Sequence, residues 1–177
     1  IPVLVAGLLK LWVQLGPAEL PTKRGFVYRF FERQADRRGV PFQMPPSHPF
    51  QPLHMLRLAI AAGSALQSVQ SIFHHIYGEG NQPDEPAAVA AAAVKLGIDD
   101  FADRIAQDDV KATFKSNTEE AIAAGAFGVP TFALDGHVFW GDDATEMFLD
   151  YLKNPQLFAS EEMNRISTMP MGLVRRS

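Results

Sequence analysis

The residues best suited to chemistry in this sequence lie in one stretch, from Gly125 to Asp143. An X-Pro bond such as Val129-Pro130 can be cis at the head of a strand, which leaves the amide and carbonyl of Val129 outside the sheet ladder. Such groups pair with an extended peptide, as in strand addition. Further on, a helix start at Asp142-Asp143 offers N–H groups to a carboxylate, and an aspartate there can hold an ammonium group. These groups together suit a small zwitterionic peptide; the alternative is a structural turn followed by an ordinary helix cap.

Local signals indicate which elements position these groups. Gly125 and Gly128 are typical of a helix end, and Thr131–Leu134 is rich in strand-forming residues. The pair Asp135-Gly136 predicts a tight hairpin that returns through His137–Trp140. Asp142-Asp143, with Glu146 three residues further on, then predicts a capped helix start.

Composition limits the classes of function. The chain has 177 residues with 47% apolar and 20% charged residues, which is typical of one globular domain or one domain with an insertion. A net charge of -4 and a pI near 5.7 argue against a nucleic-acid partner, and no apolar run is long enough for a membrane span. The sequence contains no cysteine, so any thiol chemistry must come with a ligand, and the expected location is the cytoplasm.

Three motifs resemble a known family. Gly128-Val-Pro-Thr-Phe132, the Asp-Gly hairpin and Phe139-Trp-Gly-Asp-Asp143 are similar to the C-terminal signature of the 2-hydroxychromene-2-carboxylate isomerases. These enzymes belong with the kappa-class glutathione transferases in the DsbA-like branch of the thioredoxin superfamily. The resemblance implies an α/β fold, a thioredoxin-like sheet interrupted by a large α-helical insertion.

The order of expected elements agrees with that fold. Residues 1–5 are expected to form a short buried strand, and a hairpin and a helix over 143–152 to follow a long helical block. The intervening helices are expected at 23–38, 53–63, 64–77, 85–96, 99–107 and from 108 onward. The domain boundaries then follow: a thioredoxin-like remnant at 1–42, the helical insertion at 43–107, the rest of the thioredoxin-like domain at 108–153, and a loose extension or oligomer arm at 154–177. The resemblance matches residues 2–10 to the second strand of the family and the turn after it, so the first strand, the first helix and the active-site serine are expected upstream of Ile1.

The resemblance also implies a set of site residues. Val129, beside Pro130, would bind the cysteinyl backbone of glutathione, and Gln14 stands where the family commonly has an asparagine that touches glutathione. Lys10 and Phe50 would face the substrate. The γ-glutamyl end would be bound by Trp140, Gly141, Asp142 and Asp143. No metal site is expected: His48 and His54 have no carboxylate at ligand spacing, and the adjacent His74 and His75 point about 100° apart on a helix.

The activity that the resemblance implies is a glutathione-dependent cis-trans isomerisation of 2-hydroxychromene-2-carboxylate-like intermediates of aromatic degradation. In that family the sulfur of glutathione adds to the substrate, the ring-opened adduct rotates, and the thiol leaves. A small aromatic carboxylate as substrate and a homodimer are expected with it. The alternatives are a kappa-like glutathione transferase, a noncatalytic glutathione or peptide binder, and a purely structural protein.

Overall fold

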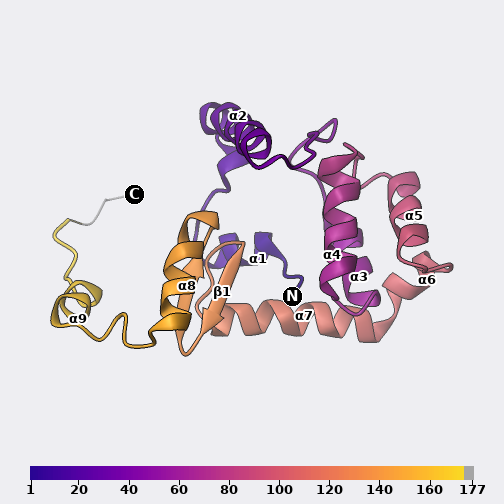
Figure 1. Cartoon of the computed structure of the whole chain (residues 1–177). Coiled ribbons are helices and arrows are strands. Elements are labelled where there is room, and N and C mark those ends of the chain that lie inside the picture. The colour runs from indigo at the N-terminus through magenta and orange to yellow at the C-terminus, as the bar shows by residue number, and fades with distance from the viewer. Residues whose placement is uncertain (174–177) are drawn as a thin grey trace. The chain divides into compact units, whose positions relative to one another are not determined.

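The computed structural model describes residues 1–173 (Figure 1). By its internal contacts the chain divides into two compact units between Phe127 and Gly128. The regular elements of the first unit are all helices. Its elements are α1 (Val5–Leu11), η1 (Pro17–Glu19), α2 (Pro21–Arg38), α3 (Leu53–Ala61), α4 (Leu66–Phe73), the π-helical turn η2 (His74–Gly78), α5 (Pro86–Lys95), α6 (Phe101–Ala106) and α7 (Asp108–Ala123).

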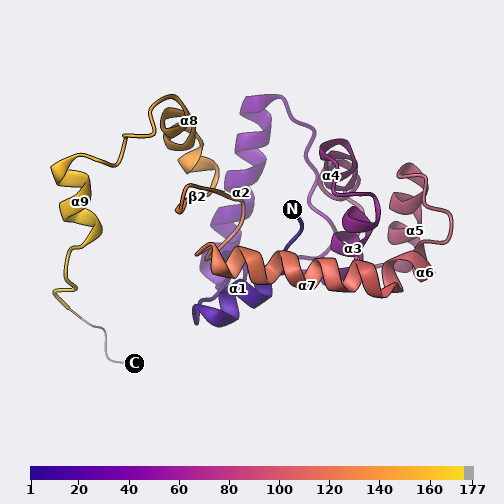
Figure 2. The same ribbon diagram turned by 90° about the horizontal axis from the view of Figure 1, so that it is seen from below.

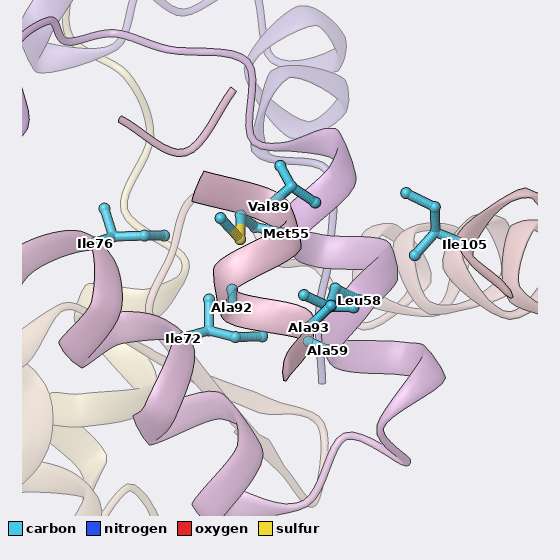
Figure 3. Packing of buried hydrophobic residues seen from close by; sticks show 9 residues of the cluster. All are labelled: Met55, Leu58, Ala59, Ile72, Ile76, Val89, Ala92, Ala93 and Ile105. Atoms are coloured by element: carbon cyan, nitrogen blue, oxygen red, sulfur yellow. The ribbon is translucent and has the colours of Figure 1, made fainter. Parts of the chain in front are cut away.

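The main core of the first unit lies among α3, α4, α5 and α6. Figure 3 shows Leu58 of α3 close to Ala93 of α5, and both are completely buried. The run of alanines in α5 presents little side-chain bulk, so the larger residues of α3 and α4 can pack against its backbone. Ile72 and Ile105 close the cluster from α4 and α6. The helical periodicity of the sequence therefore produces one continuous apolar interior in this block.

Helix α7 packs against α1, α3 and α6. Val110 and Phe114 are buried against Ile60 of α3, which forms a second, smaller cluster. Helix α1 packs on the other half of α7, where Gly7 faces Thr118, and α3 and α6 lie toward its N-terminal half (Figure 2).

The strand predicted at residues 1–5 is wrong. Residues 1–4 are not part of a sheet, and α1 begins at Val5. The N–H of Leu4 donates to Oγ1 of Thr118 at 3.1 Å, and the side-chain amide of Asn117 donates to the carbonyl of Pro2 at 3.2 Å. Two polar side chains of α7 thus bond the backbone groups that a neighbouring strand would otherwise take.

Five helices of this unit end in the same hydrogen-bonded turn. In each, one N–H bonds the carbonyl three residues earlier and the next N–H bonds the carbonyl five residues before itself, the Schellman pattern. The residue between helix and loop has a positive φ in all five: Gly39 after α2, Gly63 after α3, Gly97 after α5, Gly125 after α7, and Val13 after α1. Val13 has a φ of 52°, which is costly for a β-branched side chain.

The second unit is a hairpin covered by one helix. Strands β1 (Thr131–Leu134) and β2 (His137–Trp140) pair antiparallel, with Thr131 opposite Trp140. Asp135 and Gly136 have φ values of 50° and 80°, as the predicted hairpin turn requires. Beyond them lie η3 (Asp142–Ala144) and α8 (Thr145–Lys153), and α8 packs on β2.

An aromatic core holds this unit together. Phe139 is 1% and Tyr151 4% exposed, and Phe148 and Phe158 pack against Phe139 with ring centres 5.2 and 5.9 Å away. The segment after α8 is not a loose extension throughout, because α9 spans Glu161–Ser167 and Oγ of its N-cap residue, Ser160, accepts the N–H of Met163.

The predicted domain boundaries at residues 42, 107 and 153 stay predictions. None of the helices in residues 1–173 combines the length and apolarity that crossing a membrane requires.

Candidate functional site

The structure brings six of the predicted site residues together in the second unit. Val129-Pro130 is a cis peptide bond that leads directly into β1. The carbonyl of Pro130 accepts the N–H of Gly141 at 2.9 Å, which joins the proline turn to the start of the helix. One backbone hydrogen bond therefore links both halves of the site predicted around Val129 and Asp143.

The backbone of Val129 is available to a ligand within this unit. The neighbouring carbonyl of Gly128 accepts the hydroxyl of Thr131 at 2.8 Å, and Pro130 is bonded to Gly141. Within residues 128–173 no hydrogen bond uses the N–H or carbonyl of Val129, and this residue is 47% exposed. Hydrogen bonds at Gly128 and Pro130 thus fix the turn on either side of Val129, while the N–H and carbonyl of Val129 remain able to bond a ligand.

Trp140 lies across this turn. Its indole Nε1 sits so close to Gly128 that a Cβ there would collide with it, so position 128 requires a glycine. The indole ring is half exposed. It forms a flat apolar surface beside Val129, on the strand opposite Thr131.

The helix start beyond Trp140 suits a charged ligand. Gly141 has a φ of 85° and turns the chain into η3 and α8, and no side chain caps this start. Its first N–H groups and the positive end of the helix dipole favour a carboxylate. The carboxylates of Asp142 and Asp143 are exposed at the same end and can bind an ammonium group.

The other predicted residues belong to the first unit. Lys10 is exposed in the last turn of α1, and Gln14 follows the Val13 turn with its side chain exposed. The N–H of Gln14 bonds the carbonyl of Leu9 at 2.9 Å, so the Schellman turn fixes where the Gln14 side chain begins.

Phe50 is partly buried in an aromatic cluster. Its ring centre is 5.2 Å from that of His48, edge to face, and 6.2 Å from that of Tyr77. The hydroxyl of Tyr28 donates to the carbonyl of His48 at 3.0 Å, and its oxygen lies 2.7 Å from Nδ1 of that ring. Burial, and next the charge of Arg24, lower the pKa of His48. Burial raises the pKa of Tyr77.

Neither tyrosine of this cluster was predicted as a site residue from the sequence. Tyr28 meets His48 across twenty residues, and no spacing rule predicts that contact. Tyr77 had a detectable signal, because Phe73 lies one helical turn earlier and stacks on it at 6.2 Å.

The adjacent histidines of α4 and η2 have separate environments. His75 is 2% exposed; its Nε2–H donates to the carbonyl of Ala88 at 2.9 Å. Its Nδ1 lies 3.2 Å from a carboxylate oxygen of Glu79 and 3.3 Å from Nζ of Lys95. His74 remains largely exposed. Residues 1–173 contain no cluster of three or more potential metal ligands.

Comparison with known proteins places this geometry in context. The family model of the DSBA-like thioredoxin domain matches residues 2–153. The chain is 27% identical over 134 residues to 2-hydroxychromene-2-carboxylate isomerase of Pseudomonas putida, which covers 73% of this chain and 66% of that protein. It is 25% identical over 174 residues to glutathione S-transferase kappa 2 of Caenorhabditis elegans, which covers 87% of this chain and 77% of that protein.

The fold is similar to a solved structure. A 2-hydroxychromene-2-carboxylate isomerase superposes with a TM-score of 0.74 at 22% identity, over 86% of this chain and 78% of the other. The helical block and small sheet described above thus match a DsbA-like thioredoxin fold with a helical insertion, as the sequence predicted. The chain spans 66% and 63% of the length of two bacterial isomerases that it matches.

Proposed function

The chain belongs to the DSBA-like thioredoxin domain family, and on that premise we propose that it is a glutathione-dependent isomerase. Its substrate class would be 2-hydroxychromene-2-carboxylate-like intermediates of aromatic degradation, and its location the cytoplasm. The names of the bacterial relatives support the reaction, and the kappa-class relative supports glutathione as the co-substrate.

The observation that carries the proposal is the backbone of Val129, which takes part in no hydrogen bond within residues 128–173 and is tied to a helix start through the Pro130–Gly141 hydrogen bond. Glutathione is an extended zwitterion with a peptide backbone, an ammonium group and carboxylates. Val129 would pair with its cysteinyl backbone, and Trp140 would cover it. Asp143, with Asp142, would bind the ammonium of the γ-glutamyl end, while the N–H groups after Gly141 would receive its carboxylate.

The remaining residues would orient the second reactant. Glutathione supplies a thiolate, a good nucleophile and a good leaving group, which this cysteine-free chain does not contain. Gln14 would add a polar contact to glutathione. Lys10 would attract the carboxylate of the aromatic substrate, and Phe50 would pack on its ring. We also propose a homodimer.

The binding half of the proposal is tested by titration calorimetry with glutathione. We expect Asp143→Ala to weaken binding at least tenfold, because it removes the partner of the ammonium group; a tenfold loss corresponds to about 1.4 kcal/mol. Asp150→Ala is the matched control, since it removes an exposed aspartate from α8 in the same unit. Absence of heat with the unmodified chain, or equal affinity in both variants, would rule out this site.

The reaction is tested by following 2-hydroxychromene-2-carboxylate spectrophotometrically with and without glutathione. The isomerase proposal predicts conversion only when glutathione is present. Conjugation of an aryl halide without conversion of the chromene would instead identify a kappa-like transferase. Glutathione binding with neither reaction would identify a noncatalytic binder.

A further inference from the structure

We propose that Gln82 and Asp84 are positioning residues, which hold the segment 47–51 so that the ring of Phe50 is presented to the aromatic substrate. The inference rests on the function proposed above, in which Phe50 packs on the ring of that substrate. Both residues lie in the loop between η2 and α5, at sequence separations of 35 and 33 from their partners in the segment.

Two hydrogen bonds fasten the two ends of this segment. The N–H of Ser47 donates to Oε1 of Gln82 at 3.0 Å, and the N–H of Gln51 donates to Oδ2 of Asp84 at 3.1 Å. A third bond, from Nε2 of Gln82 to Oδ1 of Asp84 at 2.6 Å, joins the two side chains. Gln82 is buried. The three bonds therefore form a bridge that spans residues 48–50.

The polarity of this bridge requires a carboxylate at position 84. Both ends of the bridge are backbone N–H donors, so the amide oxygen of Gln82 must face Ser47 and its NH2 group must face Asp84. Asp84 then meets a donor on each side, from Gln82 and from Gln51, and a carboxylate accepts at both oxygens. The hydrogen bond from Gln82, and next that from Gln51, lower the pKa of Asp84, which favours the charged acceptor.

Capping of α5 does not account for this arrangement. An aspartate at the start of a helix ordinarily bonds the first N–H groups of that helix. Asp84 stands two residues before Pro86, the first residue of α5, yet its two oxygens bond Gln82 and Gln51. The carboxylate thus acts on the segment 47–51 and not on the adjacent helix.

The segment held in this way carries the ring of Phe50. Phe50 lies directly before Gln51, and its ring centre is 5.2 Å from that of His48 and 6.2 Å from that of Tyr77. Phe50 is only partly buried, so it can still contact a ligand. A contact between aromatic rings depends on their offset and tilt, and a displacement of Gln51 would change both. The bridge should therefore affect binding of the aromatic substrate and not of glutathione.

An exchange of the two side chains tests the polarity of the bridge. Asp84→Asn keeps the shape but turns an NH2 group toward a donor, whichever way its amide is oriented, and Gln82→Glu alone sets two carboxylates side by side. The double variant Gln82→Glu/Asp84→Asn allows all three bonds again, because the carboxylate then stands at position 82, between the N–H of Ser47 and the amide at position 84. Asp103→Asn, which changes an exposed aspartate of α6, is the matched control.

NMR spectroscopy of the full chain without ligand gives the first readout. Amide hydrogen exchange at Ser47 and Gln51 should be about tenfold faster in each single variant, and the ring proton shifts of Phe50 should change. Both should return to the unmodified values in the double variant, and Asp103→Asn should alter neither. Unchanged exchange or unchanged Phe50 shifts in Asp84→Asn, or no recovery in the double variant, would overturn the proposal.

Kinetics at pH 7 give the second readout. Asp84→Asn should raise the KM for 2-hydroxychromene-2-carboxylate about fivefold and leave kcat and the KM for glutathione unchanged, because Phe50 contributes binding to one reactant only. An equal rise in both KM values would mean that the pair merely stabilises the fold, against the proposal. No conversion by the unmodified chain would overturn the proposed function instead, and the NMR comparison, which needs neither reactant, would still decide whether the bridge positions Phe50.

Discussion

At the scale of single residues, Glu79 has several polar partners outside the candidate site. Both of its carboxylate oxygens accept hydrogen bonds from Nζ of Lys95 at 2.6 Å, and one also lies 3.2 Å from Nδ1 of the buried His75. The side-chain amide of Asn81 donates to the same carboxylate at 3.0 Å. Glu79 thereby connects the π-helical turn η2 to the last turn of α5.

This cluster predicts a pH-dependent stability. The hydrogen bond from Lys95 is the largest cause that lowers the pKa of Glu79 below its ordinary value of 4.5. A carboxyl with a lowered folded-state pKa stabilises the protein above its unfolded pKa, and that contribution is lost as pH falls through the folded value. Glu79→Gln should therefore destabilise the chain at pH 7, and the difference from the unmodified chain should shrink progressively below about pH 4.5.

Urea unfolding at a series of pH values measures this difference. Glu85→Gln is the control, because it removes a nearby charge that forms no ion pair within residues 1–173, and we expect it to change stability at pH 7 less than Glu79→Gln does. A Glu79→Gln difference that is the same at pH 3 and pH 7 would show that the Lys95 pairing does not act on stability.

At the scale of elements, the ends of the helices form a natural comparison. Four of the five Schellman turns place glycine at the positive-φ residue, and α1 places Val13 there. The Val13 side chain is 93% exposed, so no burial offsets the strain of its backbone. The strained turn separates Lys10 from Gln14, two residues proposed to contact the ligands, and it fixes the direction in which the chain leaves α1.

A reciprocal pair of substitutions tests this strain. Val13→Gly should raise the free energy of unfolding by about 0.5–1 kcal/mol, because the relief of about 1–2 kcal/mol exceeds the entropy cost of glycine. Gly39→Val, made at the equivalent position after α2, should lower it by a similar amount. Chemical denaturation measures both changes; a loss of stability in Val13→Gly would mean that the valine side chain makes a contact that outweighs the backbone strain.

The same elements show how far the sequence predicts the structure. Local signals sufficed for α2 with its Gly39 end, for α3, α5 and α7, and for the hairpin at Asp135-Gly136, because period, caps and turn residues are all local. The strand expected at residues 1–5 failed, because apolar composition does not tell whether a strand partner or side chains such as Thr118 will bond the backbone. Helix α9 was missed although Ser160 and two following glutamates form an ordinary N-terminal signal.

For the candidate site, the motif predicted the turn at Val129 and the helix start at Asp143. It did not predict the hydrogen bond from Gly141 to Pro130 or the position of Trp140 against Gly128, since both depend on the hairpin register.

At the scale of the whole molecule, the chain has two separate cores. The first is aliphatic and centred on Leu58, Val89 and Ala93, and the second is aromatic and centred on Phe139 and Tyr151. The contacts among residues are concentrated within 1–127 and within the second unit. Each core therefore stabilises its own unit directly.

Core substitutions should act locally. Leu58→Ala and Phe139→Ala each create a cavity and should cost about 2–5 kcal/mol. Amide hydrogen exchange should show the loss of protection mainly within residues 1–127 for Leu58→Ala and mainly within the second unit for Phe139→Ala. Equal loss across both units in both variants would mean that the chain unfolds as one cooperative body.

The two tryptophans give each unit its own natural fluorophore. The indole N–H of Trp12 donates to the carbonyl of Ala126 at 3.2 Å in the first unit, whereas Trp140 lies against Gly128 in the second. In Trp12→Phe, the remaining emission comes from Trp140, beside the proposed glutathione site. In Trp140→Phe, it comes from Trp12, whose indole N–H bonds Ala126 after the end of α7. A change in emission wavelength or intensity on addition of glutathione, seen with only one of the two variants, would then identify which unit the ligand contacts.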